Sequence, residues 1–214
     1  MHRILLIFSK TGNIRFIGHL DLLKTFQRAI KRADLPAAYS EGFNPHQKLG
    51  FALPLALGME GRNEAAELDL AEPMAAVDVA AKLNAALPKG LLIHNARVMG
   101  ADEKSPAALV TAACYEMTAA GAADLNQKAN GLLARESAIV QKKTKSGVKD
   151  ADIRSDIFSL RVSDGVLTAV LSAGGQRGLK PELLAGALNA AFSRYARIDI
   201  YKTIDGAFQP LISV

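Results

Sequence analysis

The chain has 214 residues, of which 50% are hydrophobic and 22% are charged. This composition excludes a disordered chain, a fibrous repeat and a protein made mainly of membrane spans. It predicts a globular protein with one large domain or two of about 100 residues each. The formal net charge of +5 is compatible with an anionic partner but does not require one.

The cysteine and histidine content excludes several kinds of metal site. Cys114 is the only cysteine, so the chain alone can form neither a disulfide nor an iron–sulfur cluster. The four histidines lack the spacing of metal ligands. We therefore expect no metal and no cofactor bound by this chain itself.

The apolar segments are too short for membrane insertion. The run at residues 4–8 is shorter than the apolar core of a signal peptide, and the later run at 51–59 contains Pro54 and Gly58. A membrane-spanning helix needs roughly 20 apolar residues. We expect a cytoplasmic, bacterial-type protein without a membrane partner.

Hydrophobic periodicity in the first half predicts the split βαβ order of a ferredoxin-like domain. Leu20, Leu23, Phe26 and Ile30 recur at helical spacing, and this helix must end before Pro36. The predicted order is a strand at 3–8, a helix at 19–33, extended segments at 37–40 and 49–53, a strand at 65–70, a helix at 77–87 and a strand at 91–98.

The same order returns in the second half. The predicted elements are a strand at 115–119, a helix at 124–135, a hairpin arm at 138–143, strands at 156–162 and 166–172 joined by an Asp164-Gly165 turn, a helix at 181–192 and a strand at 197–203. We therefore predict an α+β protein of two tandem ferredoxin-like (βαββαβ) halves with antiparallel sheets. The N-terminal domain is placed at 1–100, a linker at 101–110 and the C-terminal domain at 111–214.

The loop at residues 39–48 concentrates polar and aromatic side chains that could bind a ligand or a base. The binding candidates in this loop are Tyr39, Glu41, Phe43, Asn44, His46 and Lys48. The alternative interpretation is a structured crossover loop whose polar groups only satisfy backbone donors.

Cations cluster around the first predicted helix and in one later segment. The phosphate-binding candidates are Lys10, Arg15, Lys24, Arg28 and Lys31, with Phe16, Tyr39 or Phe43 available to stack on bases. The later segment contributes Lys142, Lys143 and Lys145. Both groups could equally be ordinary solvated surface.

Two further features could bind an anion or transfer a proton. The glycine-rich segment before Pro181 places Arg177 where a phosphate could bind, although a simple turn explains the same residues. His19 and His46 are candidates for an acid or base, although no nucleophile, kinase or metalloprotease motif accompanies them.

Several segments resemble one known family. The run FSKTGNIRFIGHLDL at 8–22, followed by YSEGFNPH at 39–46, closely resembles the radical SAM-linked (radical SAM-associated) proteins, a domain of unknown function. The segments KKTK at 142–145, DIR at 152–154 and GLKPE at 178–182 are also similar to that family. Tandem ferredoxin-like halves with a glycine-rich loop resemble, more loosely, the CRISPR repeat-processing endoribonucleases. Fold alone does not transfer their function.

The resemblance implies a radical SAM protein as the partner, because such domains are encoded beside these enzymes or fused to them. With one cysteine the chain cannot be the radical generator itself. The leading hypothesis is an accessory protein that binds or presents structured RNA, such as tRNA, to that enzyme. The alternatives are a metal-independent ribonuclease or RNA-modifying enzyme using His19 or His46, and a protein-protein adaptor that does not bind RNA.

Overall fold

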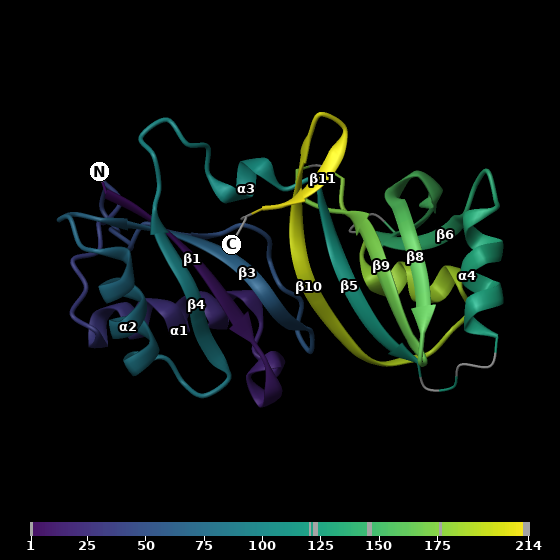
Figure 1. The fold of residues 1–214 in the computed structure, drawn as a ribbon, viewed down its shortest axis with the longest axis horizontal. Helices are drawn as coiled ribbons and strands as arrows, with labels where there is room; N and C mark the ends of the chain where they lie inside the picture. Colours follow the sequence, from purple (N-terminus) through teal and green to yellow (C-terminus); the bar gives the residue numbers. More distant parts are fainter. Residues whose placement is uncertain (1, 120, 122–123, 145–146, 176, 212–214) are drawn as a thin grey trace. The chain divides into compact units, whose positions relative to one another are not determined.

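The computed structural model describes residues 2–119, 121, 124–144, 147–175 and 177–211. The chain forms two compact units, Met1–Leu109 (unit 1) and Val110–Val214 (unit 2) (Figure 1). Each unit combines α-helices with antiparallel strands, and the described residues contain five α-helices. None of these helices is long and apolar enough to cross a membrane.

Unit 1 has its two long helices on one face of its strands. Its elements are β1 (His2–Lys10), the 3-10 turn η1 (Gly12–Phe16), α1 (His19–Arg32), β2 (Leu49–Phe51), β3 (Glu60–Leu70), α2 (Ala76–Ala86), β4 (Leu91–Val98) and α3 (Pro106–Leu109). The strands lie in the order β4-β1-β3-β2, and every neighbouring pair is antiparallel.

The core of unit 1 lies between this sheet and helices α1 and α2. Apolar side chains alternate along β1, so that Ile4, Leu6 and Phe8 face the helices. Phe8 and Phe26 meet edge to face with ring centroids 5.0 Å apart, and Phe51 contacts both rings. This aromatic cluster fixes β2 and the middle of α1 against the sheet.

The helices and strands predicted in unit 1 are present with differences at their ends, except for the extended segment at 37–40. Strand β3 begins at Glu60, before the predicted residue 65. The sequence did not predict residues 60–64 as a strand because the carboxylates Glu60 and Glu64, which are buried, interrupt the apolar pattern. Only bridges at Ala37 and Tyr39 represent the extended segment predicted at 37–40. Within the segment 101–110, predicted as a linker, the structure has α3, which contacts β2 and β3.

Unit 2 has the same strand arrangement with an added ribbon. Its elements are β5 (Ala112–Ala119), α4 (Leu125–Leu133), β6 (Ile139–Thr144), β7 (Gly147–Asp152), η2 (Arg154–Asp156), β8 (Ile157–Ser163), β9 (Val166–Ser172), α5 (Pro181–Ala187), β10 (Phe192–Ile204) and β11 (Ala207–Pro210). The order β10-β5-β9-β8 is antiparallel throughout, and β11 pairs with β10. Strands β6 and β7 form a separate two-stranded ribbon.

Turn residues define the hairpins of unit 2. The predicted Asp164-Gly165 hairpin is confirmed, since Ser163 pairs with Val166 and both turn residues have positive φ.

The helix predicted at 181–192 is shorter in the structure. It ends at Ala187, and Asn189 has a φ of 44°. Because the left-handed conformation of Asn189 stops helical propagation, Phe192 already belongs to β10.

Candidate nucleic-acid interface

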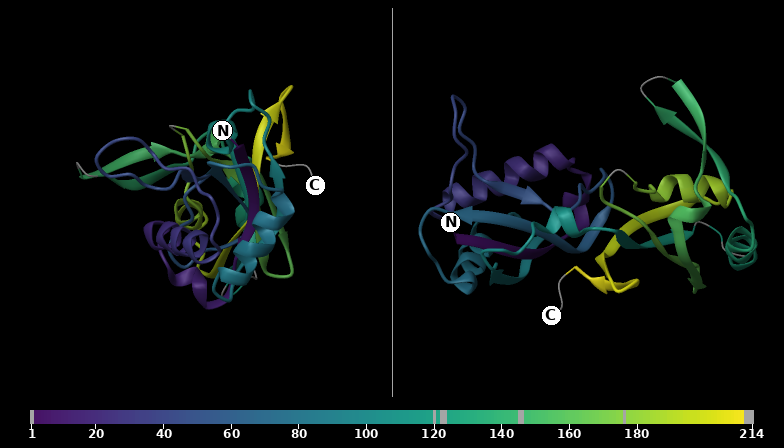
Figure 2. Two further views of the ribbon diagram at one scale, coloured as in Figure 1. Left: turned by 90° about the vertical axis from the view of Figure 1, so that its left-hand side faces the viewer. Right: turned by 90° about the horizontal axis from the view of Figure 1, so that it is seen from above.

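The loop at residues 38–48 is a narrow hairpin that projects from unit 1 (Figure 2). The Lys48 amide donates to the Ala38 carbonyl and the Ser40 amide donates to the His46 carbonyl, both at 2.8 Å. Tyr39 and Gln47 form a bridge between these two bonds. The candidates Glu41, Phe43 and Asn44 therefore lie at the exposed tip.

Within this hairpin the predicted binding residues separate into two groups. Phe43 is fully exposed at the tip, and the Tyr39 side chain is 46% exposed. Lys48 lies at the base, beside β3. The hairpin can therefore offer Phe43 at its tip and Tyr39 near its base to bases, whereas Lys48 lies beside β3.

The two histidine candidates occupy different environments. His46 Nδ1 lies 2.9 Å from the Ser40 hydroxyl, and the His46 amide donates to the same oxygen at 3.1 Å. The His19 ring packs edge to face against Phe51, 5.6 Å between centroids. In the described ranges neither ring contacts a carboxylate, and no three His, Cys, Asp or Glu side chains gather as a metal would require.

Helix α1 presents three of the predicted cations on one surface. Lys24, Arg28 and Lys31 are exposed and follow each other at intervals of four and three residues. These spacings place all three side chains on the same side of the helix, opposite the buried Leu22, Phe26, Ala29 and Ile30. We call these cations the α1 basic stripe.

The phosphate-binding prediction for Lys10 is wrong, because its side chain is completely buried. Its ammonium donates to the carbonyls of Arg15 and Ile17, at 3.1 and 2.8 Å. Lys10 therefore holds the chain that follows β1 in place.

Arg15 is only partly available to a ligand. Its guanidinium lies 4.4 Å from the centroid of the Phe16 ring and 3.7 Å from the buried Glu60 carboxylate. Nη1 also donates to the Gly12 carbonyl at 3.2 Å. These contacts fix the Arg15 side chain across η1, which leaves the α1 basic stripe as the exposed part of the predicted cluster.

The β6-β7 ribbon carries the second cationic cluster and projects from unit 2 (Figure 2). Lys142 pairs directly with Lys149 across the two strands, and Lys143 pairs with Val148. Lys142, Lys143 and Lys149 are all exposed. Lys145, the remaining candidate of this segment, lies outside the described residues.

Polar contacts fix the base of the ribbon. Asp152 accepts the amides of Ala138 and Arg154 at 2.8 and 2.9 Å, and these bonds lower the pKa of its carboxyl group. The Arg154 guanidinium donates to three carbonyls, those of Leu133, Arg135 and Ile157. Because Leu133 ends α4, Arg154 ties the ribbon to a helix terminus.

Arg177 lies close to the ribbon base rather than at a helix start. Its guanidinium is 3.5 Å from the Asp156 carboxylate and donates to the Ser155 hydroxyl at 3.2 Å. The side chain remains 74% exposed. Arg177 is therefore still accessible to an anion, although Asp156 offsets part of its charge.

An exposed aromatic pair in unit 2 was not predicted from the sequence. Phe158 on β8 and Phe208 on β11 have ring centroids 4.7 Å apart, and they are 43% and 40% exposed. Tyr201 lies beside Phe208 at 6.3 Å, and burial is the main reason that its pKa is raised to about 12. The sequence analysis predicted no strand at 207–210, so it could not place Phe208 beside Phe158.

Comparison with known proteins identifies a family. The model of the family described as "Uncharacterized protein conserved in bacteria (DUF2344)" matches residues 3–181. The chain belongs to this family. The DUF2344 match includes the loop at 38–48, the α1 basic stripe and the whole β6-β7 ribbon. No curated protein matches the chain, and the family description assigns no activity to its members.

Proposed function

We propose that this chain is an RNA-binding accessory protein that presents a structured RNA, such as tRNA, to a partner enzyme of the radical SAM class. The observation that carries the proposal is the Lys142 and Lys149 pair on the exposed ribbon. Like charges directly opposite each other destabilise a two-stranded sheet. A phosphate bound between the two ammonium groups removes that repulsion and releases counterions.

The α1 basic stripe supports the same function from unit 1. Lys24 and Lys31 are separated by seven residues, which corresponds to about 10 Å along a helix. Three cations at this spacing suit contact with a phosphate backbone, which supplies affinity without sequence selectivity. In this proposal the aromatic rings of Phe43, Phe158 and Phe208 supply stacking on unpaired bases.

The radical SAM partner is proposed from the sequence resemblance. The segments at 8–22 and 39–46 carry that resemblance, and both lie within the matched family region. With a single cysteine, the chain has a binding or presenting role rather than a radical-generating one.

We also propose that both units are ferredoxin-like. Supporting this, β4-β1-β3-β2 in unit 1 and β10-β5-β9-β8 in unit 2 repeat one antiparallel order. Each unit also has one helix after its first strand and one before its last principal strand. The ribbon is then an insertion between α4 and β8 of the second unit, at a position where unit 1 has the loop at 38–48.

The proposal is tested by RNA binding across a salt series. Fluorescence anisotropy with labelled bulk tRNA compares the parent chain with the double variant Lys142→Gln and Lys149→Gln. The matched control is Lys82→Gln with Lys89→Gln, which removes the same charge from exposed positions on and after α2.

We expect the ribbon variant to weaken binding and to reduce the slope of log affinity against log salt by about one to two. The control variant is expected to keep the parent slope. Equal slopes in the ribbon variant and the parent would show that the ribbon is not part of the RNA interface. Absence of RNA binding at low salt would overturn the proposed function.

A further inference from the structure

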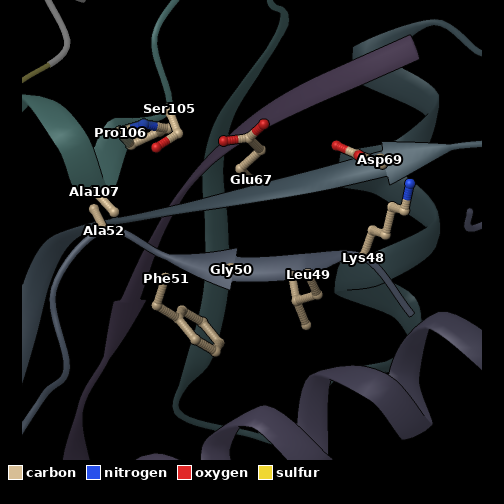
Figure 3. Close-up of a pocket in the computed structure, with 10 residues that line it drawn as sticks. All are labelled: Lys48, Leu49, Gly50, Phe51, Ala52, Glu67, Asp69, Ser105, Pro106 and Ala107. Carbon is tan, nitrogen blue, oxygen red and sulfur yellow. The ribbon is translucent and has the colours of Figure 1, made fainter. Parts of the chain in front are cut away.

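Unit 1 contains a pocket of about 340 Å³ on the sheet face opposite α1 and α2 (Figure 3). Its floor is formed by β2 and β3, and one wall is formed by the segment Ser105 to Ala107 at the start of α3. Figure 3 shows Lys48, Glu67 and Asp69 on this side of the strands, whereas Leu49 and Phe51 point toward the helices. No part of this pocket belongs to the proposed RNA contacts on α1 or the ribbon.

Strand alternation explains which side chains face the pocket. In β2 the register pairs Gly50 with Glu67, so the two residues share one face of the sheet. The Asp69 amide donates to the Lys48 carbonyl at 3.0 Å, which places these residues opposite each other one step further along. Gly50 has no side chain, and a Cβ built there meets no atom within 4 Å. The pocket is therefore open because position 50 is glycine.

The charged groups of the pocket are unequally satisfied. Glu67 is bound by the Arg3 guanidinium at 2.6 Å, so its charge is already compensated. In the part of the chain that the structure describes, Asp69 and Lys48 form no side-chain hydrogen bond or ion pair. Burial, followed by the charge of Glu67, raises the pKa of the Asp69 carboxyl group, while Lys48 acts in the opposite direction.

We propose that this pocket binds a small zwitterion of the free α-amino acid class, with the ligand ammonium on Asp69 and the ligand carboxylate on Lys48. An anion and a cation of the protein lie side by side without direct partners, and a ligand carrying both opposite charges satisfies both at once. The volume is at the small end of the roughly 300–1,000 Å³ typical of ligand pockets, which favours a small metabolite over a dinucleotide.

Calorimetric titration of the full chain with each of the twenty free α-amino acids tests the proposal. For any amino acid that binds, the N-acetyl derivative removes the ligand's positive charge and the amide derivative removes its negative charge. Both derivatives are expected to bind at least about tenfold more weakly, because each leaves one charged group of the pocket without a partner.

The Gly50→Leu variant provides a test that does not depend on charge. Leucine fills the open space above Glu67 and is compatible with a strand, so the variant is expected to fold with an unchanged circular dichroism spectrum and to lose amino acid binding. Asp69→Asn and Lys48→Met are expected to weaken binding about tenfold or more. Leu92→Ala, at an exposed position on β4, is the control and should bind like the parent chain.

Two results would overturn the proposal. The first is the absence of saturable heat for all twenty amino acids at millimolar concentration. The second is binding that persists unchanged in a folded Gly50→Leu variant. Neither result affects RNA binding by the ribbon, so the failure of this proposal is distinguishable from the failure of the proposed function.

Discussion

Lys142 and Lys149 lie directly opposite each other on the β6-β7 ribbon, so two like charges face each other on a structure with only two strands. A Lys142→Glu substitution replaces this repulsion by an opposite-charge pair, which contributes roughly 0.2–1 kcal/mol. We expect slower amide hydrogen exchange along the ribbon and, at the same time, weaker RNA binding. A variant with a more protected ribbon and tighter RNA binding would contradict the phosphate-binding role of this pair.

Much of the fold could be predicted because its local signals agree with its packing. The helix predicted at 19–33 is observed as His19–Arg32, and Phe26 and Ile30 of the predicted apolar period lie in the core with β1, whereas Leu20 is exposed. The strands predicted at 91–98 and 166–172 are observed with the same bounds. In contrast, the final hairpin was missed although Asp205 and Gly206 repeat the turn signal of Asp164-Gly165. All of β11 is exposed, so no apolar alternation marks it as a strand.

The candidate site was less predictable because sequence does not show which charged groups are already bound. Lys10 is the last residue of the buried strand β1 and donates to backbone carbonyls, whereas Lys24 is exposed on a helix surface. Both are simply cations in the sequence. The pocket beside Asp69 depends on the pairing of β2 with β3, and this pairing has no sequence signal beyond the two strands themselves.

The buried ammonium of Lys10 predicts a large loss of stability on removal of its charge. Lys10→Met keeps the length of the side chain but leaves the carbonyls of Arg15 and Ile17 without their charged donor. Hydrogen bonds to charged groups contribute about 1.5–3 kcal/mol, so we expect a decrease of roughly 2–3 kcal/mol in the free energy of unfolding in urea. Lys24→Met is the control, and its exposed position predicts a change within about 0.5 kcal/mol. Equal effects of the two substitutions would show that Lys10 is not a structural residue.

Acid should weaken the segment between β4 and α3. Arg97 binds the Glu103 carboxylate through both terminal nitrogens, and this contact is the main reason that the pKa of Glu103 falls from 4.5 to about 2. Since the folded-state pKa is the lower one, the stabilisation is fully present above about pH 4.5 and is lost as the pH falls toward 2.

The side chains of Arg97 and Glu103 are 45% and 30% exposed, so solvent screening limits the contribution of the pair to about 1 kcal/mol or less. We expect Glu103→Gln to reduce the free energy of unfolding by that amount at pH 7 and by clearly less near pH 2, where about half of the Glu103 carboxyl groups are protonated. Chemical denaturation of both chains at the two pH values measures this difference. A deficit in the variant that is the same at both pH values would exclude the ion pair as its cause.

The exposed rings of Phe158 and Phe208 predict a contribution to RNA binding that differs from that of the lysines. Stacking of one base on an aromatic side chain contributes about 1–3 kcal/mol, so Phe158→Ala should weaken binding of a single-stranded RNA by roughly fivefold or more. Because no charge is removed, the slope of log affinity against log salt should stay that of the parent chain. Val77→Ala, which shortens a side chain that is 71% exposed on α2, is the control and should leave affinity and slope unchanged. An unchanged affinity in a folded Phe158→Ala variant would assign the aromatic pair to packing within unit 2 rather than to base recognition.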